Sequence, residues 1–172
     1  MEGALKYINR VLRRKAVVFL LSDFYLPQIV IPAKAGPPNN RRARPLALWR
    51  TGIHPDGSPL TPAGMTSSAE KLLAVTAKRH DLVALQIKDP REETLPDVGL
   101  IEWREAESGE TLCVDSSDRE VRRQFAAQSI ARQRNLEALL SRHGIDHIIL
   151  RTDRSFVIPL LQFFQSRVKR FR

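Results

Sequence analysis

The pattern of apolar and polar positions predicts strands separated by helices. Residues 16–22 form a continuous apolar run of β-branched, aromatic and leucine side chains, which ends in the polar pair Ser22-Asp23. A short apolar run bounded by polar residues is typical of a strand buried on both faces. Similar runs at residues 82–88 and 147–151 predict two further strands.

Apolar residues at helical spacing predict four helices, over residues 2–14, 69–79, 117–142 and 155–169. Two pairs have the spacing of a capping box at a helix start, Ser67 with Glu70 and Ser117 with Glu120. The apolar face of the third helix is expected to hold Val121, Phe125, Ile130, Leu136, Leu139 and Leu140. Gly144 is expected to stop this helix.

Two short segments complete the pattern. Residues 98–104 and 110–114, joined through residues 107–109, predict a β-hairpin. In the last helix, Pro159 marks either a kink or the first turn. Because helices alternate with the three main strands, we expect an α/β fold in which those strands are parallel neighbours.

The segment at about residues 27–65 interrupts this alternation. It contains eight of the 11 prolines, and prolines remove backbone donors, so we expect a disordered insertion. Its short sequences VIPAKAG, GIHP and PAGMT resemble the translated product of interspersed palindromic repeats of bacterial genomes. Five cations and one carboxylate lie in it, so +4 of the net charge of +9 belongs to this segment. We therefore do not expect nucleic-acid binding.

Length and composition narrow the class of protein. A chain of 172 residues suits one domain. Cys113 is the only cysteine, which excludes an internal disulfide and fits a reducing cytoplasm. No apolar run approaches the roughly 20 residues of a membrane-spanning helix, so we expect a cytoplasmic protein without a membrane span.

Each main strand is followed by a carboxylate, namely Asp23, Asp89 or Asp153. The carboxyl ends of parallel strands share one edge of a sheet, where open α/β folds bind ligands. Hard oxygen ligands at such an edge suit Mg²⁺ or a phosphate group with its metal. The alternative is that these aspartates are ordinary turn and helix-cap residues.

Three stretches, residues 4–24, 79–101 and 143–167, resemble the bacterial domain-of-unknown-function family fifty-eight, which is typically encoded beside MoxR-type AAA+ ATPases. The run DPREE-x-LPDVG at residues 89–99 is the most specific part. The C-terminal part of the family is similar to a von Willebrand factor A domain. The resemblance implies a Rossmann-like sheet ordered 3-2-1-4-5-6, an adaptor role for the ATPase and no enzymatic activity.

Within that family this chain resembles strands four, five and six, so we expect residues 1–172 to form one truncated domain. By the resemblance, Ser22-Asp23 occupies the fourth-strand position of a metal site. The Asp-x-Ser-x-Ser loop of that site does not occur in the chain. Ser22 and Asp23 would therefore be the remnant of an incomplete site, which takes Mg²⁺ only if the missing N-terminal half is supplied.

The same resemblance makes the strand at residues 16–22 an edge, and an apolar edge favours self-association. Our first hypothesis is a non-enzymatic adaptor for a MoxR-type ATPase. One alternative is a degenerate gene product without a function of its own. The other is a Mg²⁺-dependent phosphate-handling enzyme that uses Asp23, Asp89 and Asp153.

The predicted insertion can be tested by limited proteolysis. Trypsin is expected to cut first within residues 27–64, because disordered chain with several arginines is the preferred substrate of the protease. Mass spectrometry of the first fragments identifies the site. Cleavage that begins elsewhere would contradict the expected disorder.

Overall fold

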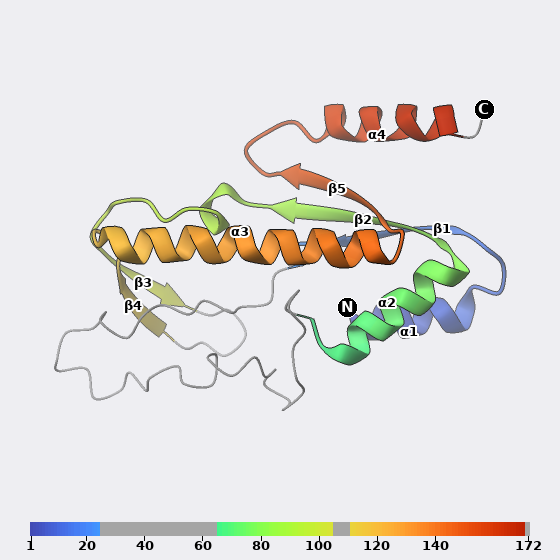
Figure 1. Cartoon of the computed structure of the whole chain (residues 1–172), viewed down its shortest axis with the longest axis horizontal. Helices are drawn as coiled ribbons and strands as arrows, with labels where there is room; N and C mark the ends of the chain where they lie inside the picture. The colour runs from blue at the N-terminus through green and yellow to red at the C-terminus, as the bar shows by residue number, and fades with distance from the viewer. Residues whose placement is uncertain (25–64, 105–110, 171–172) are drawn as a thin grey trace.

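The computed structural model describes residues 1–24, 65–104 and 111–170 (Figure 1). Its elements, in chain order, are α1 (Glu2–Val11), β1 (Val17–Ser22), α2 (Ser67–Arg79), β2 (Asp81–Lys88), the 3-10 turn η2 (Pro90–Glu92), β3 (Leu100–Arg104), β4 (Thr111–Asp115), α3 (Arg119–Arg142), β5 (Asp146–Arg151) and α4 (Val157–Arg170). Apart from Met65, the predicted insertion lies outside the described residues, as does the connection at residues 107–109.

The three main strands form a parallel sheet in the order β1-β2-β5, and β3 pairs with β4 in an antiparallel hairpin. The register places Phe19 opposite Val83 and Ser22 opposite Gln86. The expected α/β fold with three parallel neighbours and a hairpin is confirmed, and the sheet is consistent with part of a Rossmann-like fold. Within the described residues β1 is an outermost strand, as expected.

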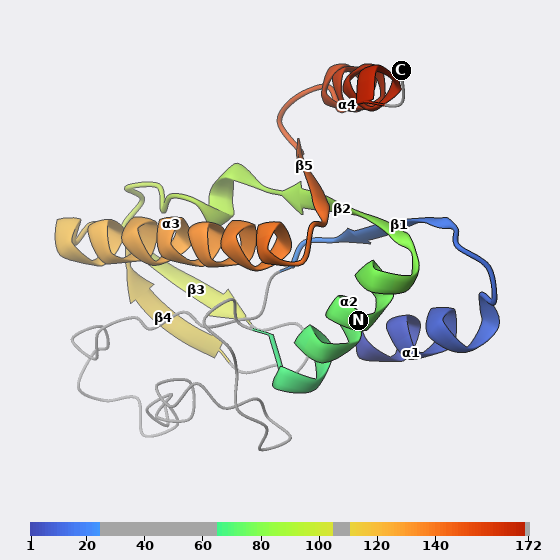
Figure 2. The ribbon, with the colours of Figure 1, turned by 45° about the vertical axis from the view of Figure 1, so that its right-hand side comes forward.

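One face of the sheet is covered by α1, α2 and α3. Its core is formed by Leu5, Val18, Leu20, Met65, Ala69, Leu73, Leu82, Ala84, Leu136, Leu139, Leu140 and Ile145. Asn9 of α1 donates a hydrogen bond to the hydroxyl of Thr76 at 2.6 Å, which fixes α1 against α2. The helix α4 lies on the opposite side of the sheet from α3 (Figure 2).

The second face of β1 is open, so the prediction of a strand buried on both faces is wrong. Val18 and Leu20 are buried, whereas Val17, Phe19 and Leu21 are 54%, 45% and 59% exposed. Burial alternates because the three helices cover one face, whereas α4 reaches β1 through the ring of Phe164, which lies 6.0 Å from that of Phe19.

A second, smaller core lies between the hairpin and the first half of α3. Leu95, Val114, Val121 and Phe125 are its buried members, and Trp103 packs on Phe125 with their ring centroids 5.9 Å apart. Ile130, predicted on the buried face of α3, is 53% exposed. The buried residue there is Ser129, because the helix passes from one core to the other at this point.

The helix termini differ from the predicted ones by a few residues. Thr66 rather than Ser67 caps α2 and accepts the Ala69 N–H at 3.1 Å. Asp118 rather than Ser117 caps α3 and accepts the Glu120 N–H at 2.8 Å. The end of the first helix was predicted too late in the chain, and the start of the last helix too early.

The first helix ends at Val11, before the expected Arg14, whereas α4 begins at Val157 and so places Pro159 in its first turn. Gly144 ends α3 in the left-handed region with φ +65°, as predicted. No helix in the described part of the chain is long and apolar enough to cross a bilayer.

The sheet core predicts the effect of truncating α2. Leu73 is 0% exposed and Val75, on the same helix, is 46% exposed. Leu73→Ala is expected to lower the free energy of unfolding by about 2–5 kcal/mol, because it leaves a cavity. Val75→Ala is the matched control and should change it by less than about 0.5 kcal/mol. Equal urea midpoints for the two variants would contradict this core.

Candidate functional site

The C-terminal edge of the sheet gathers the polar residues that follow the three main strands. β1 ends at Ser22 and the chain then turns at Phe24, which has a left-handed φ of +52°. The Phe24 N–H donates to the Ser22 hydroxyl at 3.0 Å, and this hydroxyl lies 3.4 Å from the Asp23 carboxylate. Asp23 is therefore presented at the end of the strand.

Asp89 stands after β2 and caps η2, where its carboxylate accepts the Arg91 N–H at 2.8 Å. The turn brings Glu92 back to the edge. Burial raises the pKa of Glu92, and the negative charges of Asp23 and Asp89 raise it further. Asp23 and Asp89 thus each act electrostatically on Glu92, and we call these three residues the acidic edge.

Asp153 belongs to a separate ion-pair network. Arg151 at the end of β5 binds Asp153 at 3.0 Å and Glu93 at 2.7 Å, and Glu93 binds Lys88 at 2.8 Å. The hydrogen bonds from Arg151 lower the pKa of Asp153. The structure therefore places Asp23 and Asp89 each within electrostatic reach of Glu92, whereas Asp153 is held by cations.

The acidic edge does not by itself fit a metal ion. In residues 1–24, 65–104 and 111–170, no three His, Cys, Asp or Glu side chains are grouped so that they could hold one. The assignment of Ser22 and Asp23 to an incomplete metal site stays a prediction.

A polar network between the sheet and α3 was not predicted from the sequence. The amide oxygen of the buried Gln86 lies 3.0 Å from His147 Nε2 and 3.2 Å from Gln133 Nε2. Because an amide oxygen accepts only, His147 donates from Nε2–H. Gln133 also donates to Glu137 at 2.8 Å. The only signal in the sequence was a glutamine in an otherwise apolar strand.

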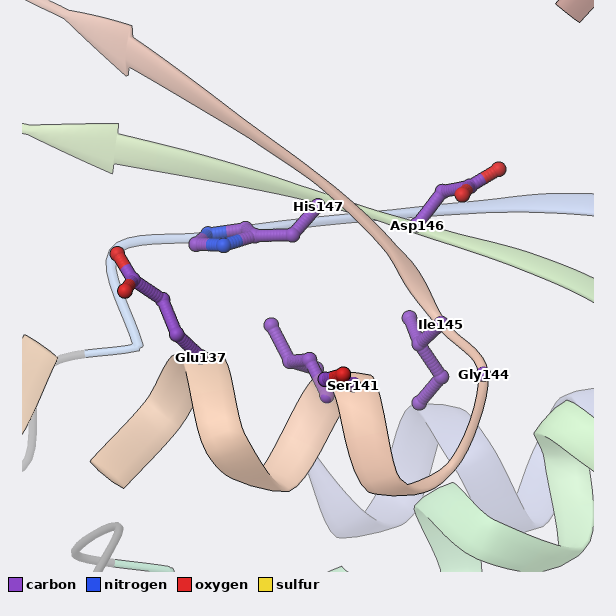
Figure 3. A pocket seen from close by; sticks show the side chains of 7 residues that line it. Glu137, Ser141, Gly144, Ile145, Asp146 and His147 are labelled. Atoms are coloured by element: carbon purple, nitrogen blue, oxygen red, sulfur yellow. The ribbon is translucent and has the colours of Figure 1, made fainter. Parts of the chain in front are cut away.

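Beside this network lies an open pocket of about 480 Å³ between the end of α3 and the start of β5. His147 and Glu137 extend toward each other along its wall, with Ser141 and Ile145 nearer the turn (Figure 3). Burial lowers the pKa of His147, although the charge of Glu137 opposes this effect. The ring therefore serves as a neutral hydrogen-bond donor to Gln86.

A further feature of the structure is apolar. We call it the open apolar surface, and its exposed side chains are Val17, Phe19 and Leu21 of β1 with Val157, Leu161, Phe164 and Val168 of α4. The contact of Phe19 with Phe164 joins its two parts. The apolar run alone predicted a buried strand, whereas the edge position implied by the family resemblance predicted that β1 loses cover. The exposed side chains of α4 were not predicted.

The acidic edge predicts a pH dependence of stability. The native state binds a proton on Glu92 more tightly than the unfolded state, so stability falls as the pH rises from the unfolded pKa through the raised native pKa. Glu92→Gln should remove this fall and raise the melting temperature at neutral pH by about 2 °C.

Glu93→Gln is the matched control, because the pKa of Glu93 is shifted in the opposite direction to that of Glu92. Hydrogen bonds from Lys88 and then Arg151 lower the pKa of Glu93, so its stabilisation is present at neutral pH and lost as the pH falls. Glu93→Gln should lower the melting temperature at neutral pH and have little effect in acid. Melting curves from acidic to neutral pH that coincide for wild type and Glu92→Gln would contradict the acidic edge.

Comparison with known proteins identifies relatives of part of the chain. The family model "Protein of unknown function DUF58" matches residues 61–135. An uncharacterized protein of Mycobacterium avium is 31% identical over 98 residues, which are 57% of this chain and 57% of that protein. Uncharacterized proteins of Mycobacterium bovis and Mycobacterium tuberculosis are each 34% identical over 95 residues, which are 55% of this chain and 30% of those proteins.

The chain thus spans just over half the length of the first relative and less than a third of the other two. No solved structure matches it. The family match covers α2, β2, the hairpin and the first part of α3. Residues 61–135 are therefore similar to the DUF58 family of unknown function, and the resemblance found in the sequence is confirmed over this part of the chain.

Proposed function

We propose that the chain is a protein-interaction module that serves as an adaptor for an AAA+ ATPase of the MoxR type and catalyses no reaction. The open apolar surface is the observation that carries this proposal. Large exposed apolar patches are uncommon on monomeric soluble proteins and mark sites of interaction. The choice of a MoxR-type partner rests on the family resemblance in the sequence.

The apolar character of α4 on more than one side supports a docking role. Leu160 and Phe163 are its less exposed apolar residues. Val157, Leu161, Phe164 and Val168 are exposed and follow one another at spacings of four, three and four residues, so they form a continuous stripe. An apolar helix face normally packs against a neighbour. This stripe is therefore suited to a partner.

Charge gives the chemistry of that partner. The sequence of α4 carries Lys169 and Arg170 beyond the paired Arg167 and no carboxylate, and Arg154 precedes the helix. A complementary surface has apolar side chains that face the stripe and carboxylates around them, since complementary potentials steer association. We expect such an acidic border on the ATPase.

The ion pairs at the C-terminal ends of β2 and β5 support an adaptor role without catalysis. Arg151 binds both Glu93 and Asp153, and Lys88 binds Glu93, so these side chains neutralise one another. Candidate catalytic groups are usually left poised in a cleft with a strongly perturbed pKa and a free path to substrate. Mutually paired side chains at the surface are better explained as stabilising the ends of β2 and β5.

The proposal is tested by measuring binding to a purified MoxR-type ATPase from the same genome, with and without ATP, by biolayer interferometry. The double variant Leu161→Asp/Val168→Asp should weaken binding at least about tenfold, since buried apolar anchors dominate interfaces. Gln162→Asp/Gln165→Asp adds the same charge to the same helix and should change binding less than about twofold.

Both double variants alter exposed residues and should keep the wild-type circular dichroism spectrum. No binding of wild type at micromolar ATPase would overturn the proposal. So would equal binding by the two double variants. Binding of the stripe to anionic lipid vesicles in place of the ATPase would assign α4 to a membrane surface and also overturn it.

A further inference from the structure

The edge of β1 that points away from β2 has the properties of a pairing surface. Within the described residues β1 pairs with β2 alone. Residues 17–22 contain neither proline nor glycine, and the strand forms its six pairs with β2 without a bulge. Charged side chains, prolines and bulges are the features that normally protect an edge from pairing. An apolar regular edge is therefore available to another strand.

The direction of the backbone groups defines which residues would pair. The Ala16 carbonyl accepts the Asp81 N–H at 2.8 Å, so Ala16 turns its carbonyl toward β2. Successive residues of a strand turn their backbone groups to alternate sides. Val17, Phe19 and Leu21 thus direct their N–H and C=O groups to the free edge.

We propose that two copies of the chain pair through this edge, with their β1 strands antiparallel about a two-fold axis at Phe19. Phe19 lies opposite Phe19 of the second copy, Val17 opposite Leu21, and Lys15 opposite Asp23. Directly opposite residues share a face of the sheet and interact. The two three-stranded sheets become one sheet of six strands, and this inference does not rest on the proposed ATPase partner.

Symmetry and charge select this register. A two-fold axis perpendicular to the sheet keeps every side chain on its own face, so odd positions pair with odd positions. A shift by two residues places either Lys15 opposite Leu21 or Asp23 opposite Val17. Only the register centred on Phe19 pairs the exposed Lys15 with the exposed Asp23 and keeps apolar residues opposite apolar ones.

Pairing would also cover the part of the open apolar surface that α4 leaves exposed. Val17, Phe19 and Leu21 gain cross-strand neighbours of their own kind, and the Phe19 rings of the two copies meet at the axis. Phe164 already contacts Phe19 from one side, so the α4 helices of the two copies border the joined face. The stripe of α4 stays outside the paired strands.

The experiment is sedimentation equilibrium of the full chain, under reducing conditions because Cys113 is free. Wild type should have the mass of two chains at micromolar concentration. Phe19→Lys places two like charges at the axis and should raise the dissociation constant at least about tenfold. Phe156→Lys makes the same change at an exposed position outside β1 and should leave the dimer intact.

A charge exchange tests the register without altering an apolar residue. Lys15→Glu and Asp23→Lys should each raise the dissociation constant about fivefold, because each creates two like-charged pairs. The double variant Lys15→Glu/Asp23→Lys should restore wild-type dimerisation. A monomeric wild type, or a dimer that survives Phe19→Lys, would overturn the proposal.

A failure of the double variant to restore the dimer, or single variants without effect, would overturn the register. If Phe19→Lys does not fold, the charge exchange alone decides, since Lys15 and Asp23 are both exposed. Loss of ATPase binding with an intact dimer would leave this inference standing, and the reverse holds as well. The two proposals therefore fail separately.

Discussion

A parallel sheet must be covered on both faces, and this requirement governs the rest of the molecule. The central strand β2 meets it, since Val83 on one face and Ala84 on the other are both fully buried. β1 meets it on one face only, where α1, α2 and α3 enclose Val18 and Leu20. The open face of β1 and the exposed stripe of α4 both follow from incomplete cover of the sheet. Each proposed interaction gives one of them additional neighbours.

Charged side chains are arranged differently at the two ends of the sheet. At the N-terminal ends of the strands, Arg167 of α4 pairs with Asp81 of β2 and Asp146 of β5, which ties α4 across the second face. At the C-terminal ends, cations neutralise Asp153 and Glu93, while the charges of Asp23 and Asp89 act unfavourably on the Glu92 carboxylate. An unfavourable interaction between carboxylates thus lies at the edge where open α/β folds bind ligands.

Local sequence patterns predicted the helices and strands, whereas burial and long-range contacts depend on the neighbours of each element in the fold. Apolar runs with β-branched residues predicted β1, β2 and β5, because such residues fit the pleated surface of a sheet. The caps were missed by one residue, since Thr66 competes with Ser67 and Asp118 with Ser117 for the same role. The burial of β1, the return of Glu92 through η2 and the contact of Gln86 with His147 depend on elements distant in sequence, so no local pattern could contain them.

The helix α3 has 24 residues, about 36 Å of length, and contributes to both cores. Val121 and Phe125 pack on the hairpin, whereas Leu136, Leu139 and Leu140 pack on the sheet. The two cores share no buried residue. Regions that share few contacts open independently and exchange their amide hydrogens with separate free energies. We therefore expect the hairpin core and the sheet core to open with separate free energies, although one continuous helix joins them.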